Sequence, residues 1–315
     1  MWRFILRRCL WLIVTVIATA LIIFTILYFN PNDPARAILG TTITPAEADA
    51  FRDALGINRP YLVQLGDFMY STFVKFDFGT SWTYQVPVFD EILSRLPRTL
   101  LIGLAAMVLN VIIGLSLGIF AGTHAGKWQD STTMAIAMVF ISCPDFWVAL
   151  MMVILFSANL GWLPAQGIGT WKHYVMPIIA SSLGGIAVNS RQTRSSILEV
   201  FRADFITTAR AKGQTERKVV WRHMLPNALM PVVTGLGSAL TRIVAGSAVI
   251  ESIYSIPGIG NYMLVCIGRL DFPGVRSCVL FFAVFSSIVM LFIDLVYGFI
   301  DPRIKAQYAS GRRGK

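Results

Sequence analysis

Six long runs of hydrophobic residues alternate with polar segments along the chain. The runs cover roughly residues 9–29, 99–121, 131–159, 174–190, 228–252 and 275–300. An apolar run of about 20 residues is long enough to cross the hydrocarbon core of a bilayer as a helix. The first run follows a basic N-terminus, but it is too long for the apolar core of a signal peptide. The pattern therefore predicts an all-α integral membrane protein with six transmembrane helices.

The distribution of lysine and arginine predicts the orientation of these helices. Basic residues concentrate in three polar segments, 1–8, 191–227 and 301–315. Cytoplasmic segments of membrane proteins carry an excess of Lys and Arg. With six spans these three segments share one side, so we expect both termini and 191–227 to be cytoplasmic. Segments 30–98 and 253–274 are then external.

Composition supports a membrane protein and excludes other classes. Hydrophobic residues make up 55% of the chain and charged residues 14%, and the mean hydropathy is +0.64. The net charge of +10 alone would suit a nucleic-acid-binding protein, but the basic residues lie in short segments beside apolar runs. The four cysteines form no C-x-x-C pair and the three histidines are scattered, so we expect no metal site, no cofactor and no nucleic acid.

The external segment 30–98 contains signals for local helices. Thr44 and Glu47 have the spacing of a capping box, with Pro45 at the first helical position. The helix is expected to end at Leu55, because the next residue, Gly56, is a good left-handed cap. Residues 61–75 predict a second, amphipathic helix.

The second apolar run contains glycines at four-residue spacing, at Gly114, Gly118 and Gly122. Small residues at this spacing allow two helix backbones to approach closely in lipid. We therefore expect this face to pack tightly against another helix.

The basic loop 191–227 contains a spaced motif. Its Ala209, Gly213, Leu225 and Pro226 match the A, G, L and P of the pattern E-A-A-x3-G-x9-I-x-L-P. Thr207 and Thr208 replace the pattern's E and A, and His223 replaces its I. The strings T-A-R-A-K-G and R-H-x-x-x-N-A-x-x-P-V-V-T complete the match. The chain resembles ABC-importer permeases of the dipeptide, oligopeptide and nickel branch, and the resemblance runs nearly end to end.

The resemblance implies a type I ABC-importer permease fold and a binding-protein-dependent importer driven by ATP. Such a permease moves substrate by alternating access, with di- and oligopeptides as the first expectation and nickel, metal–chelator complexes or glutathione as alternatives. The implied partners are a second permease subunit in a heterodimer, two ATP-binding subunits and an external solute-binding protein. The implied location is the cytoplasmic membrane of a bacterium or archaeon.

The resemblance also assigns the basic loop as the site that docks the ATPases. Locally, residues 205–212 and 215–221 predict two short helices joined at Gly213, with Thr215 as the cap of the second. The family's role carries over to Thr208, Ala209, Arg210, Lys212, Gly213, Arg217, Leu225 and Pro226. In this assignment Ala209 and Gly213 allow close approach of the ATPase, and the basic side chains supply charge at the rim.

Ionisable residues inside predicted spans indicate a translocation pathway, because burying charge in a bilayer is costly. Ser142, Pro144 and Asp145 lie in the third span, and Arg242 lies in the fifth. The resemblance predicts that Pro144 kinks its helix beside the pathway. Three roles stay open for Asp145: contact with substrate in a water-filled cavity, pairing with Arg242, or capping of backbone freed by Pro144.

The chain lacks the motifs of common enzymes. It contains no G-x-x-x-x-G-K-[ST] phosphate loop, no H-E-x-x-H and no G-x-S-x-G. We therefore expect a non-catalytic subunit, with ATP hydrolysis on separate chains. The runner-up function is an ATP-independent secondary transporter or channel, but no repeat relates the first three spans to the last three. A scaffold or sensor that only recruits a partner is the third.

Overall fold

A computed structural model of the chain describes residues 2–40, 42–229 and 247–300. Every regular element within these ranges is a helix, as the hydrophobic pattern predicts. The chain divides into two compact units. The first unit holds Met1–Thr99 and Pro257–Lys315, and the second holds Leu100–Ile256. The boundary falls inside the long helix α5 (Val88–Thr123).

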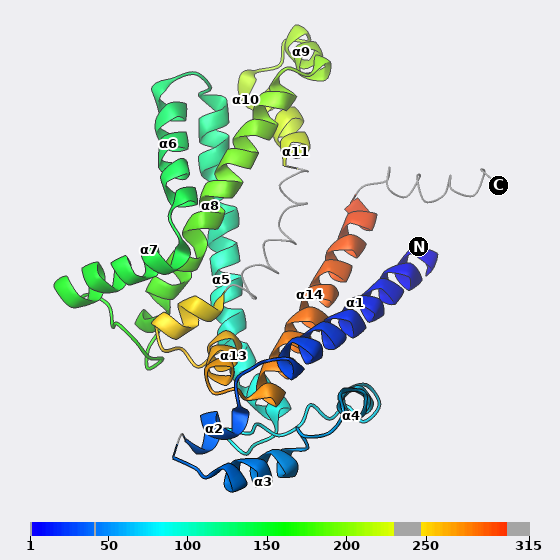
Figure 1. Cartoon of the computed structure of the whole chain (residues 1–315). Coiled ribbons are helices and arrows are strands. Elements are labelled where there is room, and N and C mark those ends of the chain that lie inside the picture. The colour runs from blue at the N-terminus through cyan, green and yellow to red at the C-terminus, as the bar shows by residue number, and fades with distance from the viewer. Residues whose placement is uncertain (1, 41, 230–246, 301–315) are drawn as a thin grey trace. The chain divides into compact units, whose positions relative to one another are not determined.

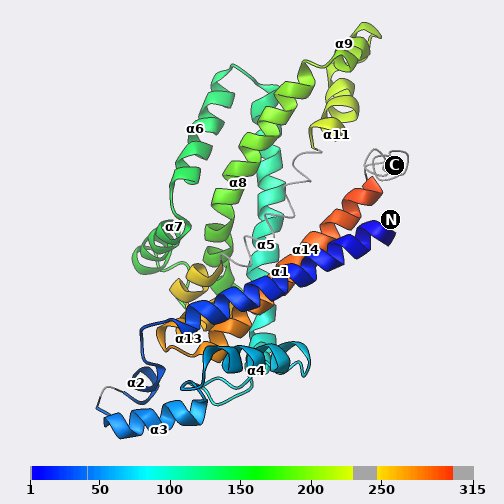
Figure 2. The same cartoon turned by 45° about the vertical axis from the view of Figure 1, so that its right-hand side comes forward.

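In the first unit, two long apolar helices pack along each other. Helix α1 (Trp2–Tyr28) lies against α14 (Phe272–Ile300), as Figures 1 and 2 both show. The shorter helices α4 (Tyr61–Phe73) and α13 (Ile259–Gly268) pack on α1 and α14, respectively. The contact is an apolar cluster that contains Val16, Ala20, Phe24, Phe68 and Leu280. The first unit is therefore a helix pair with polar-segment helices packed at its surface.

The polar segment forms the helices that its capping signals predict. Helix α3 (Pro45–Leu55) begins with a complete capping box, because Glu47 N–H donates to the Thr44 hydroxyl and Thr44 N–H donates to the Glu47 carboxylate. It ends at Gly56, which has φ +71°. The preceding helix α2 (Pro34–Leu39) is capped by Asp33. The sequence prediction for this segment is confirmed, and α4 begins at Tyr61 as expected.

One buried carboxylate ties the polar segment to the start of α14. Asp271 accepts hydrogen bonds from the N–H groups of Trp82 (3.1 Å) and Thr83 (3.3 Å) and from the Ser81 hydroxyl. Ser277 donates to the carbonyl of Phe78 at 3.0 Å. Because a buried carboxylate needs such donors, these bonds hold residues 78–83 in one conformation.

In the second unit, the glycines of α5 pack against α8 (Lys172–Phe201), which confirms the predicted close approach. A Cβ on Gly114 would lie 2.8 Å from the Cβ of Asn189, and one on Gly122 would lie 2.9 Å from a side-chain carbon of Ile197. Real Cβ atoms do not come this close. Only glycine therefore permits this helix contact without a shift of the helices.

We expect Gly118→Ala to destabilise the protein, because its Cβ would lie 2.5 Å from the Cβ of Thr193 and 2.7 Å from the carbonyl oxygen of Ser190. Overpacking of this kind typically costs about 1–3 kcal/mol. The control is Gly66→Ala in α4, where nothing lies within 4 Å of the added Cβ and up to about 1 kcal/mol of stabilisation is expected. Thermal unfolding of the detergent-solubilised variants measures both effects. An equal loss in both variants would contradict the close packing.

The predicted third span is bent far more sharply than a simple kink. Helix α6 (Trp128–Ser142) ends at Cys143, and α7 (Asp145–Met152) starts after Pro144. Helix α7 continues into the π-helix η1 (Val153–Asn159). The two halves make an angle of 97°. Cys143 and Pro144 are both extended, so the helical hydrogen-bond ladder stops here. The element is therefore a broken span or a re-entrant pair.

The described residues contain three helices that are long and apolar enough to cross a membrane, within α1, α5 and α14, or four if the bent pair counts as one span. The predicted fourth span lies inside α8, which is more polar. Most of the predicted fifth span, 228–252, lies outside the described residues. The count of six spans therefore stays a prediction.

Candidate functional site

The basic loop folds into a compact helical knob, which we define as residues 204–228. It consists of α9 (Asp204–Ala211), α10 (Glu216–Lys218), the π-helix η2 (Val219–Met224) and α11 (Leu225–Ala228). Gly213 reverses the chain after α9 with φ +73°, in the left-handed region that glycine adopts without strain. The knob thus has the two helices and the glycine turn that the sequence predicts.

The second helix of the knob is longer than predicted. It starts after Thr215, but the Thr215 side chain makes no capping hydrogen bond. It also does not stop at Trp221, because the helical run continues through α11 to Ala228. A proline inside a helix clashes with the carbonyl four residues earlier, which for Pro226 is that of Arg222. This carbonyl lies in the π-helix η2. The wider backbone spacing of a π-helix leaves room for the proline ring.

Two of the predicted docking residues belong to the knob's own core. Ala209 is 6% exposed and Leu225 is 5% exposed, and both pack with Ile206 and Met224. The same cluster includes Ile197 of α8. Helix α9 packs against η2, and within this chain Ala209 is turned inward. The role implied for Ala209, close approach of an ATPase, therefore receives no support from its position.

Arg210 connects the two sides of the turn in the knob, with its side chain 30% exposed. Its guanidinium makes a two-bond ion pair with Glu216, at 2.7 Å and 3.2 Å, across the Gly213 turn. It also lies 4.3 Å from the ring centroid of Phe201. The hydrogen bond from Arg210 holds the pKa of the Glu216 carboxyl below its usual value. Arg210 therefore stabilises the fold of the knob. The sequence-based prediction instead placed it among the basic side chains at the rim of the docking site.

The outer face of the knob is basic and carries one tryptophan. Thr208, Lys212, Gly213, Arg217 and Pro226 are exposed, as a docking role requires. The residues that sequence reasoning missed are Lys218, Trp221 and Arg222, which with Thr215 and Arg217 line a shallow groove. Trp221 is 65% exposed. The sequence signal for this part of the groove is Trp221, an aromatic residue inside a strongly basic segment.

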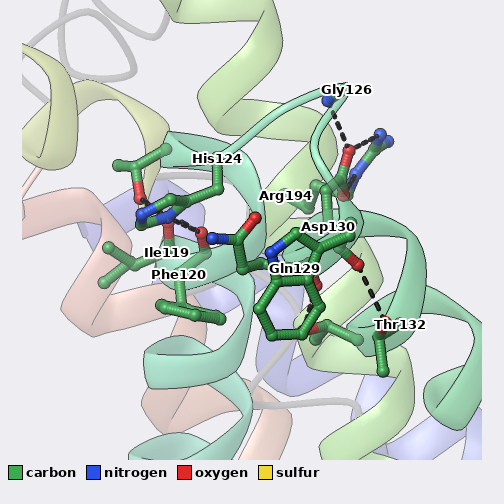
Figure 3. A network of polar contacts seen from close by, with 11 residues as sticks. Ile119, Phe120, His124, Gly126, Gln129, Asp130, Thr132 and Arg194 are labelled. Atoms are coloured by element: carbon green, nitrogen blue, oxygen red, sulfur yellow. Dashed lines mark hydrogen bonds and ion pairs between the residues drawn. The ribbon is translucent and has the colours of Figure 1, made fainter.

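Helix α8 connects the knob to the rest of the second unit. It extends beyond Ser190, where the predicted loop begins, so Arg191 and Arg194 are helical. Arg194 forms a two-bond ion pair with Asp130 of α6, at 2.5 Å and 2.7 Å (Figure 3). Gly126 N–H also donates to Asp130, which is only 3% exposed. The ion pair therefore fastens α8 to the start of α6.

The predicted pathway residues gather at the bend between α6 and α7. Ser142 ends α6, and its hydroxyl donates to the carbonyl of Met138 at 2.9 Å. Asp145 opens α7 without making a capping hydrogen bond, so its expected role as a cap for freed backbone is not observed. A Cβ on Gly184 of α8 would lie 3.2 Å from the Asp145 carboxylate. Arg242 lies outside the described residues.

Among residues 2–40, 42–229 and 247–300, no three His, Cys, Asp or Glu side chains cluster as a metal site would require. The arrangement offers a rigid basic knob and a bent apolar helix pair with one carboxylate. These features are those of a multi-pass membrane protein with a folded basic loop, and family and fold comparisons identify its class.

The chain belongs to the family of binding-protein-dependent transport system inner membrane components. The family model matches residues 114–306, and the model for the N-terminal part of such components matches residues 1–103. Members of this family are permease components of ABC importers, which work with ATPases and binding proteins. The predicted family and its peptide and nickel branch are thereby confirmed.

Relatives match almost the whole chain. The dipeptide transport system permease protein DppB of Alkalihalophilus pseudofirmus is 36% identical over 333 residues, covering 97% of this chain and 100% of that protein. The glutathione transport system permease protein GsiC of Escherichia coli strain K12 is 35% identical over 305 residues, covering 97% and 99%.

The fold is similar to that of solved ABC-importer subunits. A chain of the MetNI methionine ABC transporter in an inward-facing conformation matches with a TM-score of 0.57 at 18% identity, over 68% of this chain and 97% of that chain. A chain of an amino acid ABC transporter solved with histidines gives 0.54 at 15% identity, over 66% and 93%. The predicted class, an all-α membrane protein with an ABC-importer permease fold, is confirmed.

Proposed function

We propose that this chain is one membrane subunit of an ATP-driven importer that carries di- and oligopeptides into the cell. The names of DppB and GsiC support this substrate class, since a dipeptide and glutathione are both short peptides. Glutathione, nickel and metal–chelator complexes are the alternatives within the same importer class. An ATP-independent secondary transporter is the less favoured function, because such a transporter has no cytosolic ATPase for the knob to bind.

The observation that carries the proposal is the construction of the knob. Its core is closed by Ile206, Ala209, Met224 and Leu225, and its turn is braced by an ion pair. A rigid body of this kind can transmit force, whereas an unstructured loop of the same charge cannot. Its exposed cations and Trp221 suit a groove with acidic and apolar parts on a cytosolic ATPase.

A continuous structural path supports transmission from the knob to the bend. The knob packs on α8, and the Asp130–Arg194 pair fastens α8 to α6. The other end of α6 is the bend at Pro144. We propose that closure of two ATPases moves the knob and α8, and that α6 follows because its ion pair resists separation. The bend then changes the access of substrate, as alternating access requires.

The bend is the proposed position of the translocation pathway. Asp145 opens α7 with no hydrogen-bond or ion-pair partner among the described residues and lies beside Gly184, a position with no side chain. A carboxylate there suits the ammonium group of a peptide. Ser142 and Pro144 shape the turn, and Arg242 stays part of the proposal on sequence grounds alone.

The proposed assembly contains this chain, a second and different permease, two ATP-binding subunits and an external solute-binding protein. This chain itself is non-catalytic, and ATP hydrolysis belongs to the separate subunits. Basic segments 1–8, 191–227 and 301–315 support cytoplasmic termini and a cytoplasmic knob. Segments 30–98 and 253–274 are then external. The proposed location is the cytoplasmic membrane of a bacterium or archaeon.

Mass spectrometry of what co-purifies with the tagged chain, gently extracted from its native membrane, tests this assembly. We expect a second permease, one or two ATPases and a binding protein in near-stoichiometric amounts. Recovery of the chain alone, under conditions that keep known complexes intact, would contradict the importer and favour the secondary transporter. The ligand of the recovered binding protein then identifies the substrate.

A further inference from the structure

A cavity of about 540 Å³ lies within the first unit. The ends of α1 and α14, helices α3 and α4, and residues 77–82 enclose it. Pockets for small ligands commonly have about 300–1,000 Å³ and combine apolar walls with a few placed polar groups. Aromatic walls come from Phe24, Phe68 and Trp82. Its size therefore suits a molecule as large as an amino acid or a short peptide.

Most of the charges around the cavity are already paired. Asp33 accepts two hydrogen bonds from Arg52, one of them at 3.2 Å from Nε, and this pairing lowers the pKa of the Asp33 carboxyl. Arg59 pairs with Asp67 at 2.7 Å. The charges in these two ion pairs neutralise each other, so neither pair needs a charged ligand.

Arg276 is different, because it has no ion-pair partner among the described residues. Its guanidinium stacks on Phe68, 4.7 Å from the ring centroid, and its Nε is buried without a hydrogen-bond partner. It lies on α14, one turn inside an apolar stretch that is long enough to span a membrane. Asp271 and Asp77 stabilise its charge electrostatically, but neither forms an ion pair with it. An anionic group in the cavity would supply the direct ion-pair partner that this guanidinium lacks.

Asp77 supplies the opposite charge next to the same point. One of its oxygens accepts from Gly79 N–H at 2.8 Å. The carboxylate forms no ion pair in the described part of the chain, although it interacts electrostatically with Arg276 over a longer distance. A Cβ on Gly79 would lie 3.6 Å from Arg276 Nη2, so the open position at Gly79 faces this guanidinium. Gly79 has φ +81°, and residues 78–83 are held by Asp271 and Ser277. The lining thus offers a cation and an anion beside the same glycine, neither of them in an ion pair.

We propose that this cavity binds a small zwitterion, with its anionic group on Arg276, its ammonium group on Asp77 and any apolar side chain against Phe68 and Trp82. A free amino acid or short peptide has this chemistry, and the choice of a peptide rests on the proposed function. The site is separate from the bend, because every residue that lines it belongs to the first unit. The headgroup of phosphatidylethanolamine is the other source of the same chemistry.

Equilibrium dialysis of the full chain in lipid-free detergent, with radiolabelled L-alanyl-L-phenylalanine as the probe, tests the site. We expect saturable binding that weakens at least about tenfold for the C-terminal amide and for the N-acetyl form, because each removes one charge. Equal binding of the acid and its amide, or no saturable binding, would overturn the proposal. This comparison uses the wild-type chain and therefore does not depend on how a variant folds.

Variants then assign the two charges. Arg276→Gln should remove the preference for the acid over the amide, and Asp77→Asn should remove the preference for the free amine over its N-acetyl form. The matched control is Arg269→Gln, which removes an exposed cation outside the cavity and should leave both preferences intact. If Arg276→Gln keeps the preference for the acid, Arg276 does not hold the anion and the proposal is wrong.

Competition by glycerophosphoethanolamine separates the two sources of ligand. We expect it to displace the labelled dipeptide less well than the unlabelled dipeptide does, whereas stronger displacement assigns the zwitterion site to a lipid headgroup. Uptake by the assembled importer is a separate readout. A complex that moves no solute contradicts the proposed function without affecting dipeptide binding, so failures of the two proposals are distinguishable.

Discussion

Gly213→Asp should abolish most of the uptake while the protein stays inserted in the membrane in normal amount. Gly213 is exposed in the knob, and nothing lies within 4 Å of an added Cβ, so the fold has room for the side chain. The positive φ adds strain of about 1–2 kcal/mol. The new carboxylate also lies in a face whose exposed cations, Lys212 and Arg217, would attract the ATPase. We expect a loss of uptake of at least about tenfold, which corresponds to 1.4 kcal/mol.

The matched control for this variant is Gly161→Asp. Gly161 has φ +62°, is exposed and has nothing within 4 Å of an added Cβ. It therefore carries the same backbone strain and the same new charge outside the knob. Uptake of a labelled dipeptide, normalised to the amount of chain in the membrane, should stay within about twofold of wild type. Equal uptake by the two variants would mean that the knob does not couple the chain to an ATPase.

Arg194→Met should cause a large loss of stability. It leaves the Asp130 carboxylate, 3% exposed, with the backbone N–H of Gly126 as its remaining hydrogen-bond donor among the described residues. Removing one partner of a buried ion pair typically costs about 3–5 kcal/mol, because the other charge stays buried and uncompensated. We expect the apparent Tm of the detergent-solubilised chain to fall by at least about 5 °C.

The control is Arg191→Met, one turn earlier on α8, where the arginine is exposed and outside the ion pairs of the described residues. It should change the apparent Tm by less than about 1 °C. The double variant Asp130→Asn/Arg194→Met removes both charges and should regain part of the lost stability. Equal stability of the two single variants would show that the Asp130–Arg194 pair does not fasten α8 to α6.

The knob shows how far its motif could be interpreted from sequence alone. The local signals at Gly213 and Thr215 predicted a helix, a glycine turn and a second helix, because helix ends and starts depend strongly on the residues beside them. The same signals did not distinguish inward from outward residues. Ala209 and Leu225 are buried, and Trp221 is exposed, although all three lie on short helices of the same segment.

The ionisable residues show the same division. Arg276 lies within the predicted sixth span, yet its position beside a cavity depends on α1 and α4, which are distant in sequence. Asp130 and Arg194 lie 64 residues apart and carried no recognisable spacing. A pair of charges on two different helices can be recognised only when the packing of those helices is known.

The sequence by itself determined what depends on local chemistry. Apolar runs specify helices, the Thr44–Glu47 capping box starts α3, and the glycines of α5 allow another helix to approach closely. Only the tertiary structure decided which charges meet, how sharply the chain turns at Pro144 and which face of the knob is exposed. These properties arise from contacts between segments far apart in the chain, and the energy of such contacts depends on distance and burial rather than on sequence spacing.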